Sequence, residues 1–436
     1  MIKRIGIGLA ILVVLGAVLF STLVWRPAID PIISGSVAGF PAELLAKGHV
    51  LAGAGYCATC HTAKGGQPYA GGYGMPTPFG VIYTTNITPD PGSGIGRWSE
   101  AAFVRAMREG VSRDGSHLYP AFPFEHFTKV TDDDMKALYA FLMTREPVSA
   151  PAKPTTIPFP FNLRALQAGW KLLFFDEGTY RPVAGKSDEW NRGAYLAEGL
   201  SHCSACHTPR NALGAEKTGD ERYAGAMIQG WFAPALTAAN TAPIPWTQDE
   251  LSAYLRGGAT ALHGVAAGKM AEVVRDLRTL PDSDIQALAL YFAEINGSAT
   301  QKASSNEALH KAQTAAALDT RQASDSGAGL YLTACGACHY NNATPQNLRP
   351  ELALNSSLTA ADPANFVQVV LHGVGLEDGI PNVLMPPFAP ALSDGEIARL
   401  AAHLRRTRTD QPAWPDLEAK VAAIRKASTD NPERNP

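Results

Sequence analysis

The sequence predicts a mostly α-helical protein of three tandem domains, preceded by an N-terminal transmembrane helix. The first observation behind this prediction is the pentapeptide Cys-x-x-Cys-His, which occurs three times and contains all six cysteines of the 436-residue chain. The second is that similar short helical segments flank each copy. The third is an uncharged apolar run of 21 residues, 5–25, close to the N-terminus.

The N-terminal run follows Lys3 and Arg4 and is long enough to cross a bilayer, which takes about 20 apolar residues. A secretory signal has a shorter apolar region of about 7 to 15 residues and a cleavage site close behind it. The nearest small-x-small site here is residues 36–38, well beyond the run. We therefore expect residues 1–35 to form a single uncleaved anchor, with a cleaved signal as the alternative. In both cases the rest of the chain is exported.

Overall composition excludes some classes of partner. The net charge is −3 and charged residues make up 18% of the chain, which does not favour nucleic-acid binding. Gly (40) and Pro (32) are plentiful, as expected for small, loop-rich domains folded around a cofactor.

The repeated pentapeptide is typical of c-type haem attachment. Its two thiols add to the vinyl groups of the porphyrin, and the histidine gives the iron its proximal nitrogen. A zinc site would need two further ligands and no cysteine is spare, while a redox pair does not need a histidine after each motif. We therefore predict three covalently bound haem c groups. Their ligating and attachment residues are Cys57, Cys60, His61, Cys203, Cys206, His207, Cys335, Cys338 and His339.

Each repeat has the same predicted order of elements. A short apolar helix beginning near Gly48, Gly193 or Gly329 leads into the motif. An amphipathic helix with an acidic N-cap closes the repeat, at residues 131–139, 281–289 and 393–400. One helix before the haem and one after it, packed across each other, resembles the class I cytochrome c fold.

Composition gives the boundaries between these domains. Prolines at 147, 151, 154, 158 and 160 indicate an extended connector, because proline fixes φ and removes a hydrogen-bond donor. A second linker is rich in Ala, Ser, Thr and Gln. The predicted segments are domain 1 at 36–146, linker 147–187, domain 2 at 188–297, linker 298–325, domain 3 at 326–408 and a polar tail at 409–436.

Methionines supply candidate sixth ligands in two domains. Met270 and Met385 both precede the closing helix of their repeat, where a class I cytochrome places its axial methionine. We predict that they ligate the second and third iron.

The first domain departs from this pattern, because an ungapped alignment places Phe122 where the second domain has its methionine. His126 is the first candidate for the ligand and His117 the second; an open iron is the third possibility. Met107 falls in a probable helix, and Met75 follows the motif too early. Since Met/His ligation raises the haem potential, a bis-His haem in this domain would have the lowest potential of the three.

Several long strings carry a resemblance to a known family. They are residues 77–90 (TPFGVIYTTNITPD), 94–99 (GIGRWS), 206–211 (CHTPRN) and 270–274 (MAEVV). In these strings, and over nearly its whole length, the chain resembles the membrane-anchored triheme cytochrome c subunits of bacterial periplasmic dehydrogenases. The family serves PQQ alcohol dehydrogenases, gluconate-type flavin dehydrogenases, and molybdopterin dehydrogenases of aldehydes and N-heterocycles. Phe122 with His126, and residues 162–164 followed by 169–170, are more similar to the molybdopterin-associated branch.

The resemblance implies an electron-transfer subunit on the periplasmic face of the bacterial inner membrane. A catalytic subunit would pass electrons through three haems to ubiquinone in the lipid. That partner would be a molybdopterin subunit with an iron–sulfur subunit, or else a PQQ subunit. The sequence has no phosphate-binding loop or flavin fingerprint, so we expect no catalytic site in this chain. The alternatives are a cytochrome subunit of a respiratory oxidase chain and a haem peroxidase-like enzyme with an open iron.

Overall fold

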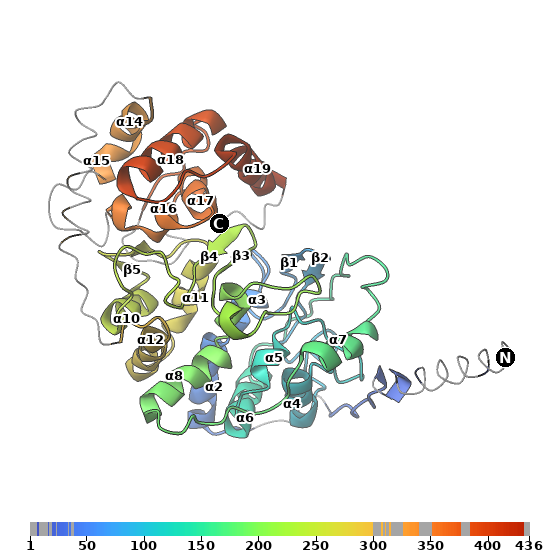
Figure 1. Cartoon of the computed structure of the whole chain (residues 1–436). Coiled ribbons are helices and arrows are strands. Elements are labelled where there is room, and N and C mark those ends of the chain that lie inside the picture. Colours follow the sequence, from blue (N-terminus) through green and yellow to red (C-terminus); the bar gives the residue numbers. More distant parts are fainter. Residues whose placement is uncertain are drawn as a thin grey trace. The chain divides into compact units, whose positions relative to one another are not determined.

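The computed structural model describes residues 20–22, 24–33, 39–299, 326–339, 351–375 and 384–430, together with residues 7, 16, 35, 307, 310 and 314. The chain divides into two compact units (Figure 1). One contains Met1–Pro182 and Glu198–His202, and the other contains Val183–Ala197 and Cys203–Pro436. Helices make up most of the regular secondary structure in the described residues, as predicted, and their sheets are two-stranded hairpins.

Most of the predicted anchor, residues 5–25, lies outside the described residues. Within the described part of the chain, no helix combines the length and the apolar character that a membrane span requires. Most of the predicted linker 298–325 also lies outside the described residues.

The first unit holds the first repeat and the connector after it. Its elements are α2 (Ala42–Ala54), α3 (Cys57–Cys60), β1 (Gly74–Thr77), β2 (Gly80–Tyr83), α4 (Glu100–Glu109), α5 (Phe124–Phe127), α6 (Asp132–Met143) and α7 (Leu166–Phe174). Helix α2 crosses α6 so closely that a Cβ atom on Gly48 would lie 2.1 Å from the Ala137 carbonyl oxygen. Lys47 and Asp134 form an ion pair at this crossing, with 2.6 Å between Nζ and Oδ1.

The second unit contains the third repeat and all of the second repeat except Glu198–His202. The second repeat comprises α8 (Asp188–Glu198), α9 (Ser204–His207), η1 (Gly219–Glu221), β3 (Ala226–Ile228), β4 (Trp231–Ala233), α10 (Gln248–Gly257), β5 (Ala259–Thr260), β6 (Gly264–Val265), α11 (Lys269–Leu277) and α12 (Asp282–Ile295). The third comprises α14 (Ser326–Leu330), η2 (Tyr331–Cys335), α15 (Gly336–His339), η3 (Leu352–Leu354), α16 (Ser356–Thr359), α17 (Ala364–His372), α18 (Asp394–Arg408) and α19 (Leu417–Asp430).

Each repeat has the predicted helix crossing, and a glycine lies at each contact. A Cβ on Gly193 would lie 2.0 Å from the Ala287 carbonyl oxygen, and one on Gly327 would lie 2.5 Å from the His403 Cβ. The sequence placed Gly48, Gly193 and Gly329 near the start of these helices, but α2, α8 and α14 begin three to six residues earlier. A Cβ on Gly329 would meet no atom within 4 Å, so Gly327 is the glycine that faces α18.

The three closing helices are confirmed as α6, α12 and α18, but their N-caps are not acidic. Thr131, Pro281 and Ser393 stand at the N-cap positions, and an aspartate follows each as the first helical residue. Ser393 forms a capping box with Glu396. The aspartates therefore do not cap these helices. They interact favourably with the positive end of the helix dipole.

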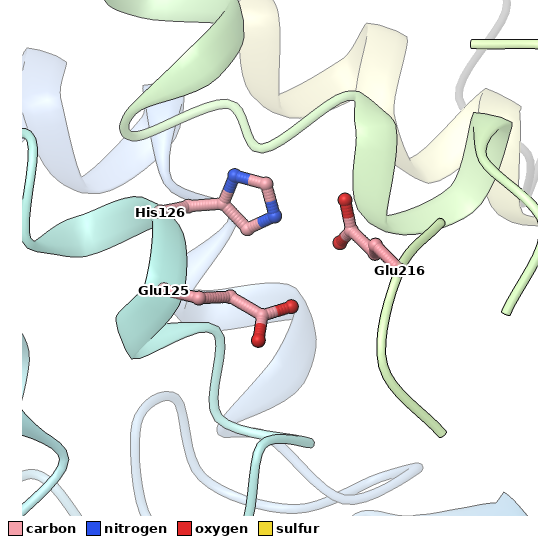
Figure 2. Close-up of side chains that lie close together, drawn as sticks. All are labelled: Glu125, His126 and Glu216. Atoms are coloured by element: carbon pink, nitrogen blue, oxygen red, sulfur yellow. The ribbon is translucent and has the colours of Figure 1, made fainter. Parts of the chain in front are cut away.

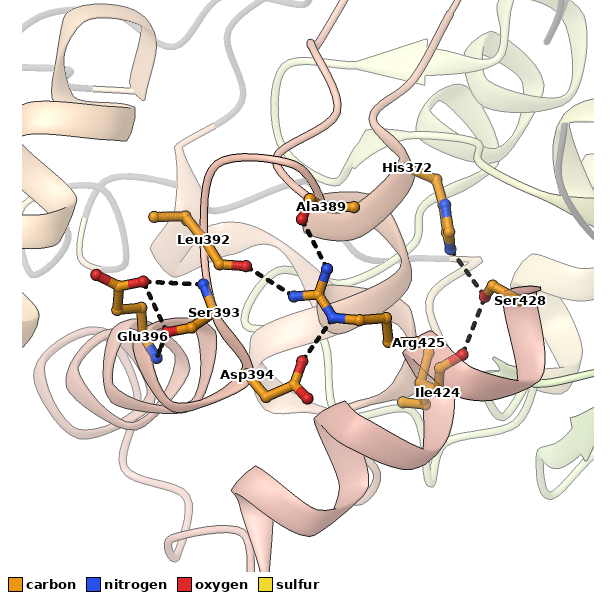
Figure 3. A network of polar contacts seen from close by, with 9 residues as sticks. All are labelled: His372, Ala389, Leu392, Ser393, Asp394, Glu396, Ile424, Arg425 and Ser428. Carbon is orange, nitrogen blue, oxygen red and sulfur yellow. Dashed lines mark hydrogen bonds and ion pairs between the residues drawn. The ribbon is translucent and has the colours of Figure 1, made fainter. Parts of the chain in front are cut away.

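Segments that the sequence assigned to a linker and a tail contain helices. The connector 147–187 includes α7, and the tail 409–436 includes α19. Arg425 of α19 donates to Asp394 Oδ1 and to the carbonyl oxygens of Ala389 and Leu392, at 2.6 to 2.7 Å (Figure 3). Helix α19 therefore belongs to the third repeat.

The second and third repeats share one apolar cluster. Ala266, Ala271 and Val274 of the second repeat are buried with Val374 of the third. Next to this cluster, the Asn365 side chain of α17 pairs with the backbone of Phe232 in β4. Its Oδ1 accepts from the Phe232 N–H at 2.8 Å, and its Nδ2 donates to the Phe232 carbonyl at 2.7 Å.

Candidate haem-binding sites

Each Cys-x-x-Cys-His motif lies on a single short helical turn. The first cysteine pair spans α3, the second lies at α9, and the third lies where η2 passes into α15. Residues three apart on helical backbone project from the same side, so each pair presents both thiols in one direction. All six thiols are free of disulfides. The motifs therefore offer the thiol pairs that two thioether bonds require.

The first motif histidine is oriented by a backbone carbonyl. His61 Nδ1 lies 2.6 Å from the carbonyl oxygen of Thr85, just after β2. A carbonyl can only accept, so Nδ1 carries the proton and Nε2 is the nitrogen suited to iron. The Gly71 N–H donates to the His61 carbonyl at 2.7 Å and holds the end of the motif.

The second motif repeats this arrangement with different residues. His207 Nδ1 lies 2.7 Å from the Pro234 carbonyl oxygen, just after β4, and the Gly225 N–H donates to the His207 carbonyl at 2.8 Å. Burial lowers the pKa of both His61 and His207 below 6.5. Both imidazoles are thus neutral at pH 7, which is the form that binds a metal.

The third motif is held from the preceding helix. The Tyr331 hydroxyl donates to the His339 carbonyl at 2.9 Å, and the Tyr331 side chain is almost fully buried. Residues 340–350, which follow the motif, lie outside the described residues.

The two candidate methionine ligands lie beside the same apolar cluster. Met270 is in the first turn of α11, ahead of the closing helix α12 as predicted. Met385 pairs with Val374 through two backbone hydrogen bonds of 2.8 and 3.0 Å. Both side chains are partly buried against the cluster shared by the second and third repeats. Their role as iron ligands stays a prediction.

His126 and His117, the candidate ligands of the first domain, are both buried. His126 projects from α5 next to Glu125 (Figure 2). Its Nδ1 lies 3.0 Å from the Glu198 carbonyl oxygen. Its role also stays a prediction. His117 has both ring nitrogens engaged: Nε2 lies 3.0 Å from the Val24 carbonyl oxygen and Nδ1 lies 3.1 Å from Lys171 Nζ. This arrangement leaves His117 no nitrogen for iron.

The other two methionines weighed for the first domain are part of its framework. Met107 is buried in the core on α4, as the sequence indicated. Met75 lies on β1 opposite Ile82 of β2.

The donor set fits haem c in the first two repeats. Each motif combines a thiol pair on one turn with a neutral imidazole whose Nδ1 is already engaged. In the first repeat Cys57, Cys60 and His61 would hold the group; in the second, Cys203, Cys206 and His207 would do so. The carbonyls of Thr85 and Pro234 were not predicted as part of the sites, because a backbone oxygen leaves no trace in residue type.

Comparisons with known proteins place cytochrome c domains at both ends of the chain. The cytochrome c family model matches residues 45–146. The family model of cytochrome c oxidase, cbb3-type, subunit III matches residues 322–404.

Several curated proteins are similar to most of the chain. The cytochrome subunit of fructose dehydrogenase from Gluconobacter japonicus is 37% identical, over 83% of this chain and 78% of its own. The gluconate 2-dehydrogenase cytochrome c subunit of Pantoea cypripedii is 37% identical, over 88% and 90%. A nicotinate dehydrogenase subunit from Pseudomonas putida is 47% identical over 93% of this chain, which spans only 34% of that longer protein.

Proposed function

The chain belongs to the family of cytochrome c subunits of dehydrogenases, and from this premise we propose that it relays electrons from a catalytic dehydrogenase subunit through three haem c groups to ubiquinone. The observation that carries the proposal is the threefold motif, with its first two histidines held by carbonyls so that Nε2 is left for iron. When bound, the haems would supply one-electron redox chemistry. The chain's own residues would attach, orient and bury them.

The proposed catalytic partner is a molybdopterin subunit with an iron–sulfur subunit that oxidises an N-heterocycle or an aldehyde. The 47% identity to a nicotinate dehydrogenase subunit supports an N-heterocycle, because nicotinate is one. Phe122 and His126 in the first domain also support this branch. A PQQ alcohol dehydrogenase subunit is the next candidate, since the cytochrome c subunit of the quinone alcohol dehydrogenase from Gluconobacter oxydans is 36% identical over 83% of this chain.

The proposed location is the periplasmic face of the bacterial inner membrane, with residues 5–25 as a single anchor. The supports are the length of this apolar run, the positive charges before it and the need for a lipid-soluble quinone acceptor.

Affinity purification of the full chain from detergent-solubilised membranes tests the proposal. Mass spectrometry of the captured subunits, cofactor analysis and ubiquinone reduction with nicotinate, aldehydes and alcohols would be measured together. We expect about three haems per chain, a molybdopterin subunit and an iron–sulfur subunit. A PQQ subunit would instead assign the chain to an alcohol dehydrogenase. A preparation with haem but no dehydrogenase subunit and no quinone reduction would contradict the proposal.

One observation favours a second candidate, a cytochrome that supplies a respiratory oxidase. The third repeat matches a family model built on an oxidase subunit. Copurification with a copper–haem oxidase, together with electron flow from quinol to oxygen, would support this candidate over the first.

A further inference from the structure

The connector and α7 of the first unit expose a set of large apolar side chains. They lie between 38% and 75% exposed, although they belong to an ordered helix and the segment leading into it. The members of this set, called the α7 face below, are Phe159, Phe161, Leu163, Leu166, Leu172 and Leu173. Six large exposed apolar side chains within residues 159–173 are typical of an interaction site.

Helix α7 is amphipathic, and its inner side explains its position. Ala168 is buried, and Lys171 donates to the carbonyl oxygens of Glu109 and Gly110 at the end of α4. Lys171 thus places a cation at the C-terminal end of α4, where it interacts favourably with the negative end of the helix dipole. Leu166 and Leu173, seven residues apart, share one side of α7, and Leu172 is exposed beside them at 69%.

The end of the N-terminal apolar run is fixed beside α7. The Val24 carbonyl accepts from His117 Nε2, and the other ring nitrogen of His117 accepts from Lys171 at 3.1 Å. Arg164, just before α7, donates to the His117 carbonyl at 3.0 Å. One buried histidine thus links the run to the helix.

The residues that follow the apolar run 5–25 form further hydrogen bonds with the first repeat, so Val24 is not the only point of attachment. The Ile29 N–H donates to the Arg113 carbonyl at 2.9 Å, and Arg105 Nη1 donates to the Pro27 carbonyl at 2.6 Å. The Ile32 N–H donates to the Arg97 carbonyl at 3.1 Å. The point where the run leaves the domain is therefore set by the fold of the first repeat.

We propose that the α7 face lies against the lipid bilayer and seats the first repeat at the membrane surface. If the apolar run is inserted in the bilayer as far as Val24, the bilayer surface lies close to His117, which contacts Val24. Helix α7 then also lies close to that surface, because its Lys171 contacts His117. The exposed residues nearby also suit an interface: Trp25 is 70% exposed, and Arg26 and Arg164 offer positive charge to anionic headgroups. The inference rests on the membrane location proposed above.

Spin labels on an added cysteine test this placement in the full haem-loaded chain. The native cysteines are taken up in haem attachment, so Leu172→Cys and Phe161→Cys each add one free thiol. Leu213→Cys is the matched control, because Leu213 is also an exposed apolar residue, at 49%, but belongs to the other unit. The chain is reconstituted in vesicles of phosphatidylethanolamine and phosphatidylglycerol. Collision rates of each label with oxygen and with a water-soluble nickel chelate are compared by electron paramagnetic resonance.

We expect labels 172 and 161 to collide more with oxygen than with the nickel chelate, and label 213 to show the reverse. Vesicle flotation of the same samples reports anchoring separately. If the chain floats with the vesicles but the labels at 172 and 161 are exposed to water, the α7 face does not contact lipid and the proposal is wrong. The anchor at residues 5–25 would be unaffected by that result. Labels shielded from both reagents would assign the face to a protein partner or a second copy and would also overturn the proposal. Failure to float would remove the membrane location itself.

Discussion

At the scale of single residues, the first two motif histidines are oriented by backbone oxygens and not by side chains. Thr85 and Pro234 are chemically unlike, yet each presents its carbonyl to the Nδ1 of a motif histidine. Proline can fill this role although it lacks an N–H, because only its carbonyl is needed. The sequence therefore predicts the iron-binding histidine while hiding the group that orients it.

Replacing Met385 with leucine tests its assignment as an axial ligand. Leucine keeps the apolar volume beside Val374 and removes the thioether. We expect the midpoint potential of the third haem to fall by a fraction of the ~0.8 V range that axial ligands span. A potentiometric titration followed by optical absorbance measures the change, and haem content should remain at wild-type level.

Met107→Leu is the matched control, since Met107 is a buried core residue on α4. It should leave all three potentials unchanged. If Met385→Leu also leaves them unchanged, Met385 is a packing residue and the ligand lies elsewhere.

His263 is expected to make the second unit sensitive to acid. Its ring stacks on Trp246 at 3.6 Å between centroids, and burial lowers its pKa to about 4 from 6.5. Because the folded-state pKa is the lower one, the unfolded chain takes up the proton first. Stability is therefore complete above about pH 6.5 and is lost as the pH falls toward 4. The loss at pH 4 should be on the order of 3 kcal/mol.

The variant His263→Phe keeps a ring against Trp246 and removes this titration. Urea unfolding at several pH values should show a shallower loss of stability between pH 6.5 and 4 than in the wild type. Other carboxylates titrate in the same range, so only the difference between the two proteins is informative. Equal slopes would show that His263 does not carry the effect.

At the scale of elements, the helix crossings set the strictest steric demands. Alanine for glycine inside a helix usually stabilises by about 1 kcal/mol. At Gly193 the added methyl group would enter the Ala287 carbonyl, and at Gly327 it would meet the His403 side chain. We expect Gly193→Ala and Gly327→Ala to destabilise by about 1–3 kcal/mol or more, which reverses the usual sign.

Gly329→Ala provides the control within the same helix, because its methyl group would meet no atom within 4 Å. Thermal unfolding should show Gly329→Ala equal to or slightly above the wild type and Gly327→Ala well below it. The opposite order would show that Gly327 is not the residue that limits the crossing.

Element prediction from the sequence succeeded where the signal was periodic. The closing helices begin at the aspartates of the expected segments, because a polar start followed by apolar residues at helical spacing specifies them. Helices α7 and α19 were missed. The first follows a proline-rich stretch that argues for extended chain, and the second is held by Arg425 reaching carbonyls that only the folded chain brings together.

At the scale of the whole molecule, the second and third repeats pack against each other and share an apolar cluster and side-chain hydrogen bonds. We expect them to melt in one calorimetric transition. Asn365→Ala would leave the N–H and the carbonyl of Phe232 without their partner, at a cost of about 1–3 kcal/mol per unsatisfied group. This variant should separate the transition into two.

Gln368→Ala serves for comparison, since it removes one bond, to the Gly230 carbonyl at 3.2 Å. It should have a smaller effect than Asn365→Ala. Two transitions already present in the wild type would mean that the repeats are thermodynamically independent.

The sequence predicted three repeats and their motifs but not this coupling. An internal repeat indicates that similar units recur, and it carries no information on which surfaces they share. The role of Asn365 cannot be seen in the third repeat alone. Its partner is the backbone of Phe232, which lies 133 positions earlier in the second repeat.

The pairing of Asn365 with β4 also has a consequence for solubility. A hairpin of two strands has open edges, and an open edge with exposed apolar residues recruits strands from other chains. Asn365 occupies both backbone groups of Phe232 on such an edge, in the place where a third strand would bond. A chain shortened to its first two repeats would lose this protection and should self-associate through β4, even with each remaining repeat fully folded.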